Sequence, residues 1–162
     1  IKRVLIADWD FHHGNGTEWA FYKDPNVLFF STHNRRAYPG TGDPSRTGEG
    51  AGKGHNINVH LGCGTDDRRM IEAWQENLLP AVARFKPELV LVSAGFDSRE
   101  GDLLGCFDVT DPGFIKLTKM VVEIAAEHCE GRLVSVLEGG YNVKGLSSAV
   151  EMHVQTLLEY AP

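Results

Sequence analysis

Five short apolar runs, rich in β-branched residues, recur along this sequence, and each has the length of a single buried strand. The apolar positions within them are mostly continuous, which is typical of strands that are covered on both faces of a sheet. These runs occupy residues 3–8, 27–32, 56–61, 88–95 and 132–139.

Three other segments repeat apolar positions every three or four residues, as one face of a helix does. Asp111 is placed as an N-cap with Pro112 as the first helical residue, and Pro80 is expected to kink the helix that contains it. Alternating strands and helices predict an α/β fold: three αβα layers around a mainly parallel sheet. The helical segments are 66–85, 111–131 and 145–160.

Composition narrows the class of protein. The 162 residues suffice for one domain, and no apolar run approaches the length of a membrane span. A net charge of −6 without any basic run disfavours general nucleic-acid binding. Three widely spaced cysteines indicate reduced thiols, so we expect a cytoplasmic protein (or a nuclear one in a eukaryote) without disulfides: Cys63, Cys106 and Cys129.

Side chains that can bind metals or protons follow several of the expected strands. The carboxyl ends of parallel strands meet at one edge of a sheet, where ligands bind in such folds. A long glycine-rich loop, residues 34–54, leaves the same edge, and loops of this length usually have a function. The strand ends carry Asp8, Asp10, His12 and His13, then Ser31 and His33, then Asp97 and Asp102, and finally Tyr141.

The spacing at the first strand end favours a metal site. Residues two apart in an extended segment point the same way, so Asp8, Asp10 and His12 share one side. Asp102 from another strand end would complete a set of two carboxylates and one imidazole. Three protein ligands with a fourth position open is the arrangement of catalytic zinc. Strand-end aspartates and single histidines are also often structural, and that reading is the simplest for His60, His128 and His153.

Four blocks make a more specific comparison possible, and they cover nearly the whole chain in order. The sequence resembles the histone deacetylase family, which has the zinc-dependent arginase/deacetylase fold, and is most similar to its class II and bacterial branch. The blocks are DWDFHHGNGT (8–17), YPGTGDPSRTGEGAGKGHNINV (38–59), LVLVSAGFDSREGDLLGCF (89–107) and LEGGYN (137–142).

The resemblance implies a role for each matching residue. Zn²⁺ would be held by Asp10, His12 and Asp102, and Tyr141 would be the catalytic tyrosine. A structural K⁺ would lie at Asp8, Ser31 and Thr32, with contributions from Asp10 and His12. A second monovalent site would use backbone carbonyls near Phe21, Asp24, Val27 and His55. Substrate would contact Tyr38, Val109, Gly139 and Gly140, and Asn15 would hydrogen-bond a histidine outside this sequence.

The implied activity is hydrolysis of N-acetyl-lysine, in histones or other proteins, or of a related acetylated amine by zinc-activated water. The family's proton-transfer histidines lie in an upstream Gly-His-His segment that this sequence lacks. We therefore expect residues 1–162 to be the carboxyl-terminal part of one catalytic domain, inactive by itself.

Other interpretations stay open: a non-catalytic metal-binding or interaction module, an acetylpolyamine amidohydrolase, or an arginase-like ureohydrolase with two Mn²⁺. The last would need a second Asp-x-Asp segment, which GFDSREGD lacks. No nucleic-acid or membrane partner is expected, and substrate and oligomeric state remain undetermined.

Overall fold

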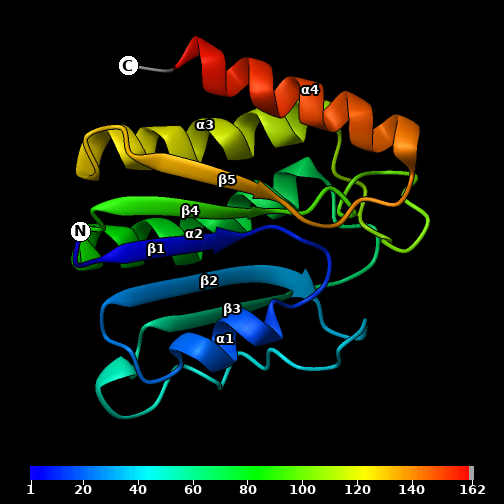
Figure 1. Cartoon of the computed structure of the whole chain (residues 1–162). Coiled ribbons are helices and arrows are strands. Elements are labelled where there is room, and N and C mark those ends of the chain that lie inside the picture. Colours follow the sequence, from blue (N-terminus) through cyan, green and yellow to red (C-terminus); the bar gives the residue numbers. More distant parts are fainter. Residues whose placement is uncertain (161–162) are drawn as a thin grey trace.

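A single parallel sheet organises the molecule, and all five expected strands are confirmed in it. The computed structural model describes residues 1–160. The strands stand in the order β3-β2-β1-β4-β5, and each neighbouring pair is parallel (Figure 1). Their bounds are β1 Val4–Asp8, β2 Val27–Asn34, β3 Asn56–Leu61, β4 Leu89–Ala94 and β5 Leu133–Leu137.

Helices lie on both faces of this sheet, α2 and α3 on one and the short α1 on the other, which confirms the α/β class. Figure 1 shows α1 in front of the sheet and α2 behind it, while α4 packs on α3 beside β5. The short α1 has no counterpart among the expected helices because seven residues, one of them Gly16, give little periodic signal. The bounds are α1 Asn15–Phe21, α2 Asp67–Phe85, α3 Asp111–His128 and α4 Val143–Glu159.

The helix ends agree with the sequence to within three residues. Asp66 caps α2 by accepting a hydrogen bond from the Arg69 N–H, and α2 continues past Pro80 as one helix. Thr110, one residue before the expected position, is the N-cap of α3, which leaves Asp111 in the first turn. No helix within residues 1–160 is both long and apolar enough to cross a membrane.

The core between the sheet and α2 and α3 is built around Trp9, the residue between two aspartates. Its indole is fully buried and lies 5.7 Å from Trp74 of α2 and 6.5 Å from Phe114 of α3, measured between ring centroids. Neighbouring side chains of an extended segment point to opposite sides. Burial of Trp9 in the core therefore directs Asp8 and Asp10 away from it.

The expectation of three reduced cysteines was wrong for two of them. Cys63, after β3, and Cys106, after β4, form a disulfide, while Cys129 is a free, buried thiol. The partners are 43 residues apart and have no diagnostic spacing. The fold brings them together by pairing the two connections, where the Gly64 N–H donates to the Cys106 carbonyl.

A buried histidine should make stability depend on pH. His153 of α4 is hydrogen-bonded through Nδ1 to Thr118 Oγ1 and through Nε2 to Ser135 Oγ, and burial lowers its pKa to about 4. The unfolded chain has the ordinary value near 6.5. Its contribution to stability is therefore complete above pH ~6.5 and is lost as the pH falls towards 4.

We predict that His153→Leu removes one proton from this dependence. Between pH 6.5 and 4.5 the slope of unfolding free energy against pH should decrease by about 1.4 kcal/mol per unit, because leucine does not titrate. Urea unfolding at several pH values measures this slope. Equal slopes in the two proteins would contradict the assignment of a neutral His153.

Candidate metal centre

The carboxyl ends of β1 and β4 bring three potential metal ligands together. The two strands are adjacent, with Asp8 in register with Ser93. Just beyond them, Asp10, His12 and Asp97 each offer a ligand atom, and these atoms lie within 4.8 Å of one another. His12 Nδ1 is 2.8 Å from Asp97 Oδ2 and 3.4 Å from Asp10 Oδ1.

The structure brings Asp97, and not the expected Asp102, together with Asp10 and His12. The Asp102 carboxylate is occupied by backbone donors at 2.8–3.1 Å: the N–H groups of Leu104, Gly105, Tyr141 and Asn142. Asp97 follows the end of β4 by only three residues, whereas Asp102 lies in the next turn. Proximity to the strand end was the signal in the sequence that favoured Asp97.

The carboxylates of Asp10 and Asp97 repel one another, and burial shields them from water. Burial, followed by the charge of Asp10, raises the pKa of Asp97 to about 7. The same two causes raise the pKa of Asp8 well above its usual range, with a further contribution from Glu138. A hydrogen bond to Asp10 raises the pKa of His12. A cation at this point would neutralise the excess negative charge.

Two glycines keep the space between the carboxylates open. A Cβ on Gly139 would lie 2.5 Å from Asp97 Oδ2 and 2.6 Å from Asp10 Oδ2, and a Cβ on Gly95 would overlap the Asp10 carboxylate. The Gly139 N–H also donates to Asp10 Oδ2 at 3.0 Å. The space between the carboxylates is small, has oxygen and nitrogen donor atoms around it and is open on one side. These properties fit a zinc ion.

A cavity of about 610 Å³ opens above the cluster and is lined by aromatic side chains. The rings of Tyr38 and Tyr141 lie 6.5 and 6.4 Å from the His12 ring, measured between centroids. Tyr38 is 81% exposed and Tyr141 44% exposed, so both stand at the rim. Burial, then the charges of Asp97 and other carboxylates, raises the pKa of Tyr141 further above neutral pH.

The expected cavity residue Val109 is corrected to Leu104. Val109 is fully buried, and its backbone pairs with that of Ser98 and Glu100, so its side chain belongs to the core. Leu104 is 58% exposed and lines the cavity beside Tyr141. Leu104 lies in the turn that the Asp102 carboxylate holds, and no local pattern in the sequence indicates that it is exposed there.

The residues expected to hold K⁺ are buried together behind the cluster. Asp8 Oδ1 accepts the Asp10 N–H at 2.9 Å, and Asp8 is in register with Ser31 of β2. Ser31 Oγ lies 3.0 Å from His33 Nδ1, and Thr32 Oγ1 donates to the Asp8 carbonyl at 3.4 Å. Occupation by a cation stays a prediction.

The second expected cation site lies at the other end of these strands. The Phe21 carbonyl accepts the Asp24 N–H, and the His55 carbonyl accepts the N–H of Phe29. Val27, also expected at this site, is the first residue of β2 and is buried. This site also stays a prediction.

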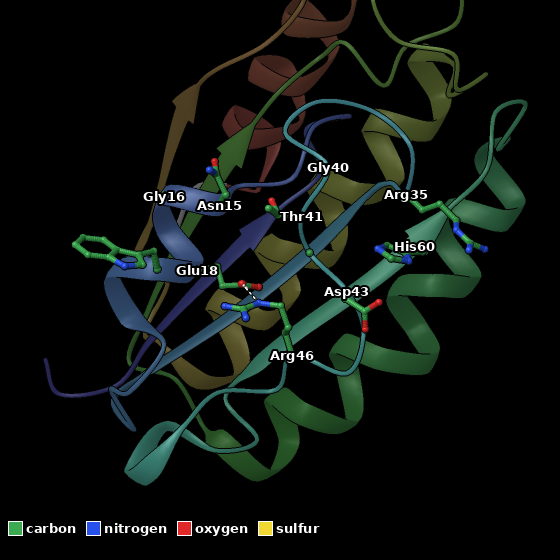
Figure 2. A pocket seen from close by; sticks show the side chains of 11 residues that line it. Asn15, Gly16, Glu18, Arg35, Gly40, Thr41, Asp43, Arg46 and His60 are labelled. Atoms are coloured by element: carbon green, nitrogen blue, oxygen red, sulfur yellow. Dashed lines mark hydrogen bonds and ion pairs between the residues drawn. The ribbon is translucent and has the colours of Figure 1, made fainter.

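A buried carboxylate fastens the glycine-rich loop beside the cavity. Glu18 of α1 accepts hydrogen bonds from Arg46 at 2.6 Å, Asn56 at 3.0 Å and Asn58 at 2.7 Å, and Figure 2 shows the Glu18–Arg46 pair. Burial alone would raise its pKa, but hydrogen bonds from His13 and these donors lower the value to about 2. Asn15, at the start of α1, is exposed. It lines the cavity above the metal cluster and also a second cavity, which Glu18 and Arg46 line.

Comparison with known proteins now decides the family. A model of the histone deacetylase domain matches residues 1–157. The chain belongs to the histone deacetylase family. It is 48% identical over 150 residues to histone deacetylase 10, chloroplastic, of Oryza sativa subsp. japonica, an alignment that covers 93% of this chain and 34% of that protein. It is 44% identical over 168 residues to histone deacetylase clr3 of Schizosaccharomyces pombe, which covers 100% and 24%.

Solved structures agree with this assignment. The histone deacetylase Clr3 superposes with a TM-score of 0.91 at 42% identity, covering 98% of this chain and 27% of that one. The HDA15 HD domain superposes with a TM-score of 0.92 at 41% identity, covering 99% and 46%. The fold is thus that of histone deacetylases, and the chain spans less than half the length of these relatives. The compartment stays a prediction.

Single substitutions should distinguish the role of Asp97 from that of Asp102. Asp97→Asn should weaken Zn²⁺ binding at least ~10-fold, because it removes a charged ligand. Asp102→Asn should leave zinc affinity within about threefold, because that carboxylate bonds only backbone N–H groups. Competition with a chromogenic chelator measures both affinities in the full-length protein. The reverse order would restore Asp102 as the ligand.

Proposed function

We propose that this chain is the carboxyl-terminal, metal-binding part of a zinc-dependent deacetylase that hydrolyses N-acetyl-lysine in proteins. The supporting observation is the cluster of Asp10, His12 and Asp97 beneath an aromatic-rimmed cavity, in a member of the histone deacetylase family. Acetyl-lysine is a narrow aliphatic chain with a polar amide at its end, which suits apolar walls above a polar floor.

Asp10, His12 and Asp97 would hold the zinc ion. Bound zinc would supply Lewis acidity towards the amide carbonyl. Backbone N–H groups hold both carboxylates in place: those of Gly139 and His12 donate to Asp10, and that of Phe11 donates to Asp97 Oδ1 at 2.8 Å. K⁺ at Asp8, Ser31 and Thr32 would reduce the negative charge behind this set.

The Tyr141 hydroxyl would donate a hydrogen bond to the amide oxygen as negative charge develops there. Tyr38 and Leu104 would flank the methylene chain of the substrate, and the backbone of Gly139 and Gly140 would approach its end. We assign the proton transfers to histidines of the parent protein outside this sequence, one of which Asn15 would orient.

An acetylated polyamine is a second candidate substrate. Glu138 lines the cavity beside Tyr141 and adds negative charge to that of Asp10. A polyamine would place a free ammonium group near these carboxylates, and its attraction to them would favour binding.

Acetate release by the full-length protein tests the proposal. The zinc-loaded protein should hydrolyse an acetyl-lysine peptide, with an acetylated polyamine assayed in parallel. Tyr141→Phe should lower kcat roughly 10²–10³-fold while zinc content is unchanged, because only the oxyanion donor is lost.

Two outcomes would contradict this account: wild-type kcat in Tyr141→Phe, or no acetate from either substrate. A preference for the polyamine would select the second candidate, and two manganese ions per chain would indicate an arginase-like enzyme instead.

A further inference from the structure

The disulfide between Cys63 and Cys106 lies close to the residues that shape the cavity. The two Cα atoms are 4.9 Å apart, and the bond joins the β3–α2 connection to the β4–α3 connection. Cys63 is exposed and Cys106 is half-buried, so the Cys63 side of the bond is open to solvent. The third cysteine, Cys129, is buried and donates to the Pro87 carbonyl.

Asn34, the last residue of β2, connects this disulfide with the metal-binding segment. Its Nδ2 donates to both sulfurs, at 3.7 Å to Cys63 Sγ and 3.6 Å to Cys106 Sγ. Its backbone N–H donates to the carbonyl of Phe11, the residue between Asp10 and His12. The Phe11 ring in turn packs on Phe107 at 4.9 Å between centroids.

On the other side of Cys106, the chain runs directly into the turn that holds Tyr141. Gly105 packs so closely on the backbone of Asp97 that a Cβ there would overlap the Asp97 carbonyl oxygen. Asp102 accepts the N–H groups of Leu104 and Gly105 through Oδ1. Its Oδ2 accepts those of Tyr141 at 2.8 Å and Asn142 at 3.1 Å. Asp102 thus couples the disulfide-bonded segment to the tyrosine.

We propose that Cys63–Cys106 is a site of thiol–disulfide exchange with low-molecular-weight thiols, and that its reduction loosens the Asp102 turn and Tyr141. A thiolate attacks the sulfur of Cys63, the exposed residue of the pair, forms a mixed disulfide and releases Cys106 as a thiolate. A second thiol resolves the mixed disulfide. The protein disulfide is reduced to two thiols by two electrons, and the two small thiols are oxidised to one disulfide.

Exposure favours this chemistry over a permanent structural role. Exposed disulfides exchange more readily than buried ones. Without the covalent link, the two connections are joined only by weaker contacts, such as the hydrogen bond from the Gly64 N–H to the Cys106 carbonyl, and residues 102–106 keep the packing of Gly105. Opening of this segment exposes the amides that Asp102 binds.

Intact-mass and peptide mass spectrometry of the full-length protein test the exchange. The protein equilibrated with oxidised glutathione should carry the Cys63–Cys106 bond, and excess reduced glutathione should add ~2 Da without unfolding it. Cys129→Ala should behave identically, whereas Cys63→Ser should show no such change. Two free thiols under oxidising conditions, or a bond that resists glutathione in the folded protein, would overturn the proposal.

Hydrogen–deuterium exchange of the same protein tests the coupling. Reduction should speed exchange about tenfold in peptides that span residues 102–106 and 140–143, with α3 unchanged as an internal reference. Cys63→Ser should exchange as the reduced wild type does in either buffer. Equal exchange in both redox states would disprove the link to Tyr141.

Comparing kcat between the oxidised and reduced forms tests the consequence for catalysis. Only this experiment rests on the proposed function. Reduction should lower kcat several-fold at constant zinc content, because Tyr141 is less well placed. An unchanged kcat would overturn that consequence. If neither redox form releases acetate, the proposed function fails, while the mass and exchange results still decide the inference.

Discussion

Like charge gathered at the ends of two adjacent parallel strands is the constraint on which the rest of this structure depends. Asp10 and Asp97 are held against the same imidazole, with Asp8 buried behind them. Burial and mutual repulsion raise the pKa of Asp97 to about 7, so both carboxylates are ionised together only at a free-energy cost. A cation bound between these carboxylates would offset that cost.

The surroundings of the cluster follow from that constraint. Trp9, locked in the core, turns the neighbouring aspartates towards the strand ends, and Gly139 leaves room where any side chain would fill the space between carboxylates. Backbone N–H groups hold the carboxylates in place: the Phe11 N–H donates to Asp97 Oδ1, and the Gly139 N–H donates to Asp10 Oδ2. At Asp102 the roles are the opposite: its side-chain carboxylate accepts the backbone N–H of Tyr141 and thereby positions that residue.

Local patterns in the sequence predicted the strands and the shared side of Asp10 and His12, because alternation and apolar runs are local properties. Residues of the turns were less predictable. Asp97 and Asp102 stand in one segment, and only the three-dimensional turn decides which carboxylate reaches His12. For the same reason, the sequence predicted Val109 as a cavity residue, whereas the structure has Leu104 there. The Cys63–Cys106 bond depends on which connections the topology places together, and no local signal encodes that.

Zinc-edge anomalous diffraction from crystals of the full-length protein tests most directly whether Asp10, His12 and Asp97 form one zinc site. We predict one strong peak, about 2.0–2.2 Å from a nitrogen of His12 and from carboxylate oxygens of Asp10 and Asp97. We also expect the Asp102 carboxylate to remain hydrogen-bonded to the Tyr141 backbone. A peak coordinated by Asp102, or no zinc between Asp10 and His12, would contradict the account.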